Sequence, residues 1–522
     1  MSTLFRRPNK SVSSIRAIEY TIPFLKSSIP FAFNGLNFFS SITCIVKKQG
    51  VVKVSIVNQD VYIVQGSKNI AEIFRNPYLT MTRAYGIALK HCFGMKQRAV
   101  NTYRYDTSGS RVKPIPGSNV LNSARIGLPT HENLSHGLLG AGLDQITLRF
   151  EKEFYDSMEL PEVGGDWTYY PDFARFIEAQ LGICVLKTLF GPLLVQQPKF
   201  VDDLFDFDRH VMDLARRLPF ILAPKAHRAR RRVLNGIKNW HRDAHALSEE
   251  TSEDPRHDGS DIAWGTAMVK DRQKMLLDVD GQDEDAVISA DLALIWASVT
   301  NVVPSSVTVA LHLFTDPSLL AETRQCVERI DPGRQRPDIR ALEKQPLLQS
   351  LHAESLRFGV QIHIPRAAPH HTVSISNARI PKDELILVST YLAHNDPDIW
   401  NTQEGKHPLD TFWAGRFLID PHDPFSGPRR RPTQSVPEAT RLNSEVEFSV
   451  EGLEGAWIPY GGGHHACPGR LLAKRIMILF IAVMVERFDI EPMAEFKYSS
   501  PRFGFGVQKP LGKIPFRIKR RR

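Results

Sequence analysis

Residues 457–470 read WIPYGGGHHACPGR, and this segment constrains the fold more than any other part of the chain. Three glycines precede Cys467, a Pro-Gly pair follows it, and apolar residues at helical spacing predict a helix over 470–487. Glycines let a backbone turn tightly and approach a flat ligand closely. Backbone N–H groups at a helix N-terminus lower the pKa of a nearby thiol and stabilise its thiolate. The segment therefore predicts a cysteine that ligates a metal from one side.

Three other interpretations of this segment compete. A phosphate-binding loop would end in Gly-Lys-Ser or Gly-Lys-Thr, which is absent here. A zinc site built from His464, His465 and Cys467 lacks a second Cys or His pair at ligand spacing. An inert cysteine beside a turn is the ordinary case for most cysteines. The chain has only five cysteines, an odd and scattered set that does not form a disulfide framework and that favours a reducing compartment.

The segment resembles the haem-binding loop of the cytochrome P450 superfamily, in which an aromatic residue is followed at fixed spacing by glycine, a basic residue, cysteine and glycine. These positions are Tyr460, Gly463, His465, Cys467 and Gly469. The family usually has phenylalanine where Tyr460 stands and often arginine where His465 stands. The resemblance implies haem b as the cofactor, with Cys467 as its axial thiolate and His465 at a haem propionate. Thiolate donation to iron favours O–O cleavage.

A second part of the resemblance lies upstream, at Glu354 and Arg357 in a helical pattern. Side chains three residues apart on a helix share one face and can pair. The motif Glu-x-x-Arg also occurs elsewhere in the chain, but this copy precedes Cys467 by 113 residues and is followed by further family landmarks. By resemblance, Arg416 completes a buried Glu354–Arg357–Arg416 cluster that holds the haem pocket together, and Arg366 reaches a haem propionate. The alternative for Arg366 is a solvated strand residue.

Residues 292–314 form the longest uncharged run in the sequence. Its serines, Asn301 and Pro304 are poor choices against lipid, so we predict a buried helix with an interrupted middle rather than a membrane span. In the family this helix crosses the distal face of the haem, where an acid and a threonine organise oxygen and its protons. Here Thr300 stands where the acid is expected and Asn301 where the threonine is expected. These two residues are therefore the candidates for proton delivery.

The sequence predicts a mainly α fold with small β-sheets, a single large haem-binding domain of the cytochrome P450 type. Residues 51–64 alternate as in a β-hairpin, helical patterns dominate from about residue 133 to 349, and short strands are expected over 372–388. No repeat or composition break divides the chain. We expect a basic and apolar N-terminal segment at 1–50 that contacts a membrane, one domain at 51–519 and a basic tail at 520–522.

The resemblance implies a haem-thiolate monooxygenase that takes electrons from an NADPH-dependent cytochrome reductase and uses O2 to oxidise an apolar substrate. The stretch from Trp296 to Pro304 is similar to the branch that contains prostacyclin synthase and the bile-acid sterol hydroxylases. A terpenoid, a sterol or another polycyclic, lipid-like secondary metabolite is the substrate expected from that branch. A haem-thiolate isomerase or dehydratase that acts on a pre-oxidised substrate without a reductase is one alternative. A non-catalytic haem- or lipid-binding protein is another.

The net charge of +9 favours a membrane surface and an acidic reductase over nucleic acid, because the basic C-terminus lacks interleaved aromatic residues. Apolar residues 218–224 precede a basic run at 225–232, which suits peripheral contact with lipid headgroups or, alternatively, a buried helix start with a solvated basic face. Arg470, Lys474 and Arg475 suit the docking of an acidic reductase. No apolar stretch of ~20 residues lies near the N-terminus. We therefore expect peripheral or weak attachment to the cytoplasmic face of the endoplasmic reticulum membrane.

Overall fold

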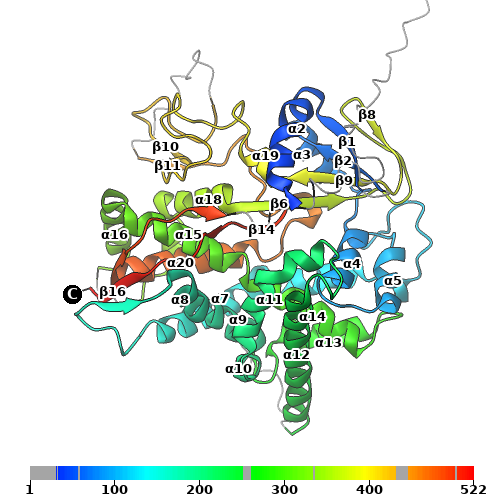
Figure 1. Ribbon diagram of the computed structural model, residues 1–522, viewed down its shortest axis with the longest axis horizontal. Coiled ribbons are helices and arrows are strands. Elements are labelled where there is room, and N and C mark those ends of the chain that lie inside the picture. Colours follow the sequence, from blue (N-terminus) through cyan, green and yellow to red (C-terminus); the bar gives the residue numbers. More distant parts are fainter. Residues whose placement is uncertain are drawn as a thin grey trace, which may run out of the picture.

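A computed structural model gives the fold of residues 31, 33–56, 59–250, 260–332, 336–430, 445–499 and 503–521. Residues 1–30 of the predicted N-terminal segment, and the last residue of the predicted tail, lie outside the described residues. Figure 1 shows a helical lower half and a smaller, strand-rich upper part that carries both the first helix and the central strands. The predicted fold class, mainly α with small sheets, is confirmed.

The helices occupy most of the described chain. Their bounds are α2 Gly35–Gln49, α3 Ser67–Arg75, α4 Thr82–His91, α5 Gln97–Tyr105, α6 Gly127–Leu138, α7 Gly140–Ser157, α8 Phe173–Ile177, α9 Ile183–Phe190, α10 Pro192–Gln196, α11 Phe200–Ala215, α12 Pro224–Glu250, α13 Ala267–Leu277, α14 Glu284–Val299, α15 Val302–Thr315, α16 Pro317–Ile330, α17 Ile339–Leu342, α18 Pro346–Gly359, α19 Thr390–His394 and α20 Arg470–Arg487. A π-helical turn, η2 (Glu178–Gly182), joins α8 to α9, and 3-10 turns lie at η1 (Asn122–Ala124) and η4 (Gly463–His465).

Within the described residues, the strands form one five-stranded sheet, in the order β1-β2-β9-β6-β14, and five smaller sheets. Their bounds are β1 Val51–Ile56, β2 Gln59–Val64, β3 Thr168–Tyr170, β4 Ser260–Asp261, β5 Gly265–Thr266, β6 Val360–Arg366, β7 Val373–Ile375, β8 Ala378–Ile380, β9 Leu385–Ser389, β10 Leu418–Ile419, β11 Glu447–Phe448, β12 Phe488–Pro492, β13 Tyr498–Ser499, β14 Phe505–Val507, β15 Lys509–Pro510 and β16 Phe516–Arg520. The predicted hairpin at residues 51–64 is present, with Val51 opposite Val64 in an antiparallel register.

Both ends of the described chain pack against the rest of the fold. Helix α2 buries Phe38, Phe39, Ile42 and Val46 against the outer face of β1 and β2. At the other end, β16 pairs with β12 along its whole length and with β3 over Phe516, Arg517 and Ile518. The structure therefore makes α2 part of the folded body, and it places Arg520 in a strand, whereas the sequence predicts that this residue begins a tail.

The interrupted buried helix is present as predicted, split into α14 and α15 at Thr300 and Asn301. Pro304 explains the break, because a proline ring clashes with the carbonyl four residues earlier, here that of Thr300. Within the described residues, Glu284–Thr315 is the single stretch long and apolar enough to cross a membrane, and 78% of its most apolar window is buried inside the protein. This stretch is therefore a core helix by its packing.

Candidate functional site: a cysteine loop beneath a broken helix

The glycine-rich segment folds into a closed loop that ends at the start of α20. The backbone N–H of Cys467 donates to the carbonyl of Tyr460 at 2.9 Å, and that of Ala466 donates to Gly463 at 3.1 Å. The N–H of Gly469 donates to the Cys467 sulfur. Helix α20 begins at the next residue, Arg470, so the positive end of its dipole lies beside the sulfur. This arrangement stabilises negative charge on Cys467.

Glycines are required where this loop crosses α3. Gly463 has φ +65°, and a Cβ built on it would lie 1.8 Å from the carbonyl oxygen of Phe74. A Cβ on the preceding Gly462 would lie 2.2 Å from the Phe74 ring. Any larger residue would force the loop off the end of α3. The close approach of the two backbones therefore fixes where Cys467 stands.

The Cys467 thiol differs from the thiols of the three buried cysteines. Its residue has exposed surface although protein surrounds it, and burial raises its pKa against the opposing effects of Gly469 and Arg470. Burial also raises the pKa of Cys92 to about 12 and of Cys184 to about 11, so both remain neutral thiols packed in the core. Cys467 is therefore the cysteine placed to bind a ligand.

Arg366 is a buried cation without an acidic partner among the described residues. It ends β6, and its guanidinium lies 5.5 Å from the ring centroid of Phe74 and donates from Nη1 to the Pro365 carbonyl at 2.9 Å. Its Nη2 is buried and has no hydrogen-bond partner among the described residues. Burial lowers the pKa of Arg366 to about 10. An unpaired donor of this kind suits an anion, because a buried cation is costly until it is paired.

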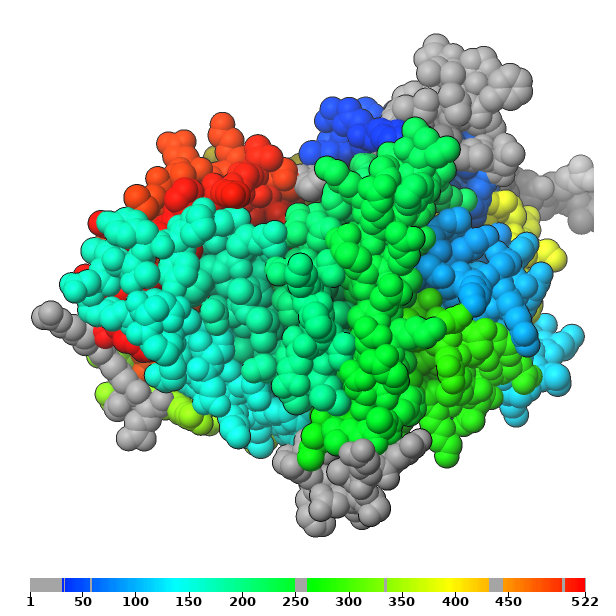
Figure 2. Space-filling view, turned by 60° about the horizontal axis from the view of Figure 1, so that its bottom comes forward, coloured from blue at the N-terminus to red at the C-terminus, as the bar shows by residue number. Residues whose placement is uncertain are grey.

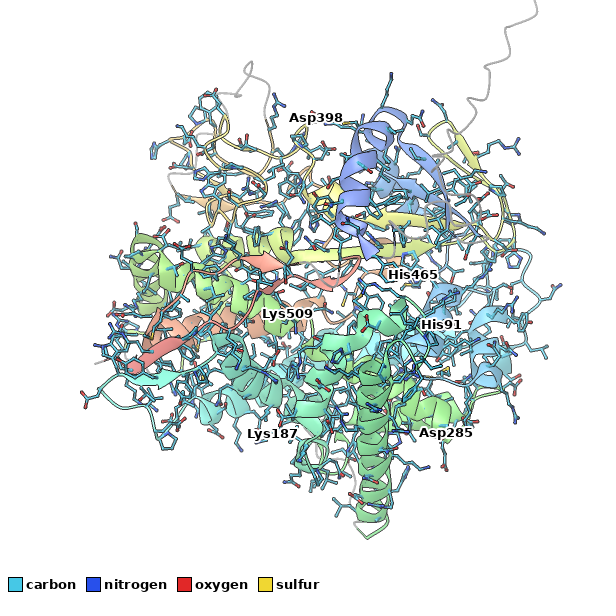
Figure 3. All side chains as sticks on the ribbon, viewed as in Figure 1. His91, Lys187, Asp285, Asp398, His465 and Lys509 are labelled. Carbon is cyan, nitrogen blue, oxygen red and sulfur yellow. The ribbon has the colours of Figure 1, made fainter. Side chains whose placement is uncertain are left out.

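A cavity of about 250 Å³ is lined both by Arg366 and by residues of the segment 457–470, which we call the cysteine loop. It is lined by Arg366, His464, His465 and the segment around Ser110 and Arg111, and none of its lining residues is acidic. His465 contacts the Leu79 carbonyl at 3.3 Å and the Ser110 hydroxyl at 3.4 Å, and burial lowers its pKa to about 3. Figure 3 places His465 between strand β6 and the helices of the lower half. The structure thus brings together the two residues that the sequence assigns to propionates, although His465 is neutral.

The predicted Glu354–Arg357–Arg416 cluster is assembled and completely buried. Arg357 meets the Glu354 carboxylate through two nitrogens, at 2.7 and 2.9 Å, and Arg416 Nε lies 3.1 Å from each carboxylate oxygen. The remaining N–H groups of the two arginines donate to the carbonyls of His394, Asn401, Pro408, Leu409 and Thr411. Burial by itself raises the pKa of Glu354, but the two guanidiniums leave it lowered. Both guanidiniums share the one carboxylate, and neutral carbonyls accept their other N–H groups, so no charged group in the cluster lacks partners, which is the condition under which such a cluster is stable.

His394 links this cluster to the cysteine loop, a role that the sequence analysis missed. Its Nε2 accepts from the Ile458 backbone N–H at 3.1 Å, so its proton is on Nδ1, which donates to the Arg357 carbonyl at 3.1 Å. Burial lowers the pKa of His394 to about 3, which keeps the ring neutral as both bonds require. The sequence shows only a histidine within a landmark segment. Its two backbone partners, one 37 and one 64 residues away, appear only in the folded chain.

The broken helix has one face that is not fully buried. Leu294, Ala297, Ser298 and Asn301 have partly or fully exposed side chains, while the rest of α14 from Ala286 on is buried. Their spacing of three and four residues places them on one side of the helix. The Thr300 hydroxyl donates to the Trp296 carbonyl at 2.7 Å, within the helix. The Asn301 Oδ1 atom has no partner among the described residues.

Two of the three cations expected on the reductase-facing side are engaged within the protein. Arg475 pairs with Asp144 at 2.8 Å and with Glu343 at 3.2 Å. Lys474 donates to Gln349 at 3.2 Å, and burial lowers its pKa. Arg470 donates to the Cys467 carbonyl at 3.0 Å and is only partly buried. The charge that Arg475 offers to a partner is therefore largely compensated by its two carboxylates.

These residues fit the haem group that the sequence resemblance implies. Cys467 supplies an exposed free cysteine, Arg366 a buried donor without a partner among the described residues, and Leu294, Ala297, Ser298 and Asn301 a partly apolar, partly polar helix face. Gly462 and Gly463 let the loop lie close to α3, because neither residue carries a side chain that would meet Phe74. The arrangement combines a thiolate ligand, Cys467, with an anion-binding group, Arg366, and with a helix face that carries both apolar and hydroxyl side chains.

Comparison with known proteins agrees with this arrangement. The family model described as Cytochrome P450 matches residues 194–516. Cytochrome P450 monooxygenase fsoE of Humicola fuscoatra is 32% identical over 494 residues, covering 90% of this chain and 81% of that protein. Cytochrome P450 monooxygenase efuG of Hormonema carpetanum is 29% identical over 526 residues, covering 96% and 89%. Cytochrome P450 7A1 of Oryctolagus cuniculus is 25% identical over 360 residues, covering 64% and 63%.

A solved structure shares the fold. The retinoic acid-bound cyanobacterial CYP120A1 superimposes with a TM-score of 0.65 at 14% sequence identity, and the match covers 97% of this chain and 99% of that one. At that identity the likeness concerns the fold alone.

Proposed function

This chain belongs to the cytochrome P450 family of haem-thiolate monooxygenases, and from this premise we propose that it hydroxylates or otherwise oxidises an apolar polycyclic substrate with O2 and electrons from an NADPH-dependent cytochrome reductase. The observation that carries the proposal is Cys467, an exposed free cysteine immediately before the N-terminus of α20 whose sulfur accepts the Gly469 backbone N–H. Haem bound through a cysteine thiolate supplies the activation of dioxygen, because the thiolate donates electron density that favours O–O cleavage.

The chain's own residues divide the remaining work. Cys467 would ligate the iron, and Arg366 would bind a propionate, since its Nη2 has no partner among the described residues and the neutral His465 lines the same cavity. Gly463 and Gly469 hold the loop close to α3 and to the sulfur, while Tyr460 closes it through its carbonyl. The Glu354–Arg357–Arg416 cluster and His394 keep α18 fixed against the loop.

Sterols and related terpenoids are the substrate class that we propose. Support comes from the similarity to Cytochrome P450 7A1 and to the 25-hydroxycholesterol 7-alpha-hydroxylase of Rattus norvegicus, which is 23% identical over 397 residues. The apolar stripe of Leu294 and Ala297 next to Ser298 suits a largely hydrocarbon skeleton with few polar groups.

The test is turnover of a sterol and triterpene panel by the purified protein with a cytochrome P450 reductase and NADPH under ¹⁸O2. Incorporation of one labelled oxygen atom into product is expected. The missing acid–threonine pair favours a second candidate, an isomerase or dehydratase that acts on a pre-oxidised substrate. Anaerobic conversion of an endoperoxide or hydroperoxide without NADPH, together with no labelled product, would replace the first function by the second.

Asn301 is the residue that we expect to matter for proton delivery at the distal face. The Thr300 hydroxyl already donates within the helix, whereas the Asn301 Oδ1 atom is buried and has no hydrogen-bond partner among the described residues. Asn301→Leu should lower product formed per NADPH consumed by about 10²-fold, the lower end for a lost proton-transfer group. Thr300→Val serves as the control and should change this ratio little. Coupling that falls in Thr300→Val and not in Asn301→Leu would reverse the assignment.

Arg366 should hold the haem without stabilising the rest of the fold. Arg366→Leu removes an unpaired buried cation, and it should speed haem transfer to excess apomyoglobin by about 10-fold, as expected for one lost charged hydrogen bond. The unfolding midpoint in urea should stay near that of the parent. Arg125→Leu is the matched control, because buried Arg125 donates to Ser108 and to the Val112 carbonyl, so its loss should lower the midpoint. Unchanged haem transfer in Arg366→Leu would contradict the propionate role.

We propose peripheral contact with the cytoplasmic face of the endoplasmic reticulum membrane through the loop between α11 and α12 and the adjoining N-terminal segment. Ile221 and Leu222 are 88% and 68% exposed at the loop tip, and exposed Lys225, Arg228 and Arg231 follow on α12. The Arg216 guanidinium lies 5.4 Å from the ring centroid of the exposed Phe33. In Figure 2 the segment around residues 200–250 forms a ridge whose upper end adjoins the N-terminal helix. Apolar tips beside basic residues bind headgroup layers.

Replacing the loop tip should release the protein from lipid. Ile221→Asp with Leu222→Asp should weaken binding to vesicles of phosphatidylcholine and phosphatidylserine by about 10-fold or more, since each buried aliphatic side chain contributes about 1.5–3 kcal/mol. Co-sedimentation measures the effect. Leu121→Asp is the control, since Leu121 is equally exposed on a different segment. Equal losses in the two variants would show that this loop is not the membrane contact.

The reductase is expected on the side of the protein where the cysteine loop meets α20. Because Arg475 and Lys474 are engaged internally, Arg470 is the residue of the three that offers its charge most directly to an acidic partner.

A further inference from the structure

The cysteine loop carries a polar side-chain pair at its first turn. The Tyr460 hydroxyl lies 3.1 Å from Nε2 of His352, and the two rings are close to parallel, 21° apart, with centroids at 6.3 Å. His352 lies on α18, two residues before Glu354, and is buried, while Tyr460 is partly buried. The pair joins a helix that the Glu354 cluster holds rigidly to the loop that presents the sulfur.

Tyr460 is coupled to Cys467 in two ways. Its carbonyl accepts the Cys467 backbone N–H at 2.9 Å, so the two residues close the same turn. Burial, and then the charge of Cys467, raise the pKa of the Tyr460 hydroxyl. The Tyr460 carbonyl thus holds the Cys467 backbone, while the hydroxyl of the same residue is bonded to His352.

The direction of the hydrogen bond follows from the state of His352. Burial, with a smaller contribution from Lys474, lowers the pKa of His352 to about 3, so the imidazole is neutral. A neutral imidazole has one acceptor nitrogen, and a phenol is the better donor of the two groups. The Tyr460 hydroxyl thus donates to Nε2, which directs its proton at α18.

We propose that His352 is a positioning residue that tunes the thiolate through Tyr460, holding the hydroxyl proton toward α18 so that the sulfur keeps its full electron donation. This inference rests on the ligation of haem by Cys467 and goes beyond it. Without His352 the hydroxyl is free to rotate about its C–O bond, and the negative sulfur attracts the positive end of its dipole. Groups that stabilise charge on a ligating sulfur raise the reduction potential, a recognised influence of the residues around the ligands.

The experiment measures the ferric/ferrous reduction potential and the Soret band of the ferrous carbon-monoxide complex in the purified holoprotein. His352→Phe should shift the potential to more positive values and move the Soret band toward the blue. His352→Gln keeps an acceptor for the hydroxyl and should leave both close to the parent values. His312→Phe is the matched control. His312 lies in α15, its ring stacks on Phe412, and burial lowers its pKa to about 4. Its replacement should leave the reduction potential unchanged.

A double-mutant cycle with Tyr460→Phe shows whether the effect passes through the hydroxyl. In that background His352→Phe should produce no further shift. The same shift with and without the hydroxyl, or no shift in His352→Phe, would overturn the proposal. A shift of the reduction potential in His352→Gln as large as that in His352→Phe would overturn it too. If His352→Phe fails to fold, His352→Gln and Tyr460→Phe still test the proposal. A parent protein without a thiolate-type carbon-monoxide spectrum would instead contradict the proposed function itself.

Discussion

Cys467→Ser should abolish the far red-shifted Soret band of the reduced, carbon-monoxide-bound protein, together with all reductase-dependent turnover. Serine keeps the size of the side chain and the backbone bond to Tyr460, but its hydroxyl is not ionised at neutral pH and donates far less electron density. Absorption spectroscopy of dithionite-reduced protein under carbon monoxide checks the result.

Cys92→Ser provides the control for this substitution. Cys92 is buried in the core, and burial raises its pKa to about 12, so it does not act as a thiolate. Its replacement should leave the red-shifted band in place. A red-shifted band that persists in Cys467→Ser would show that another residue ligates the haem.

Glu354→Gln should lower the free energy of unfolding of the holoprotein by about 3–5 kcal/mol, the range for breaking one member of a buried ion pair. The Glu354 carboxylate accepts hydrogen bonds from Arg357, Arg416 and the Trp413 backbone N–H. A neutral amide cannot compensate the positive charge of two buried guanidiniums. Urea unfolding followed by tryptophan fluorescence and by the Soret band measures the loss.

The same motif supplies a control. Glu72 is an exposed residue three positions before Arg75, so Glu72→Gln should change the free energy of unfolding by less than about 0.5 kcal/mol. Similar losses at the two positions would mean that the Glu354 cluster contributes no more than a surface pair.

The Glu354 cluster also predicts a pH dependence. The folded-state pKa of Glu354 is lowered below its ordinary value of 4.5, so the folded protein binds this proton less readily than the unfolded chain. Its contribution to stability is therefore complete above pH 4.5 and is lost as the pH falls through the folded-state value. As the pH falls from 4.5 to the folded-state pKa of Glu354, the free energy of unfolding should decline more steeply in the parent than in Glu354→Gln. Urea unfolding at a series of pH values measures the difference. Parallel declines would exclude Glu354 as the titrating group.

Much of the fold and the site could be predicted because several signals are local. The glycines before Cys467, the helix start at Arg470 and the Glu354–Arg357 spacing are consequences of backbone geometry over a few residues, and the structure places all three as expected. The break at Thr300 and Asn301 was equally visible, because Pro304 acts on a carbonyl only four residues away.

Other features depended on contacts between distant segments. The His394 bridge and the Tyr460–His352 pair each join residues that lie far apart in sequence, so no local pattern marks them. The expectation that Arg475 is available to a reductase changed for the same reason, since its carboxylate partners come from α7 and from the turn before α18.

The sequence by itself determined the ligating cysteine, the family and the mainly helical class, because a short loop with an obligatory backbone course encodes them. Only the tertiary structure decided the electrostatic state of the groups around that cysteine. It left Arg366 without a carboxylate partner in the described part of the chain, paired Glu354 with two arginines and kept His352, His394 and His465 neutral. The physical reason is that charge states follow from burial and from neighbours brought together by folding, and neither is written in the local sequence.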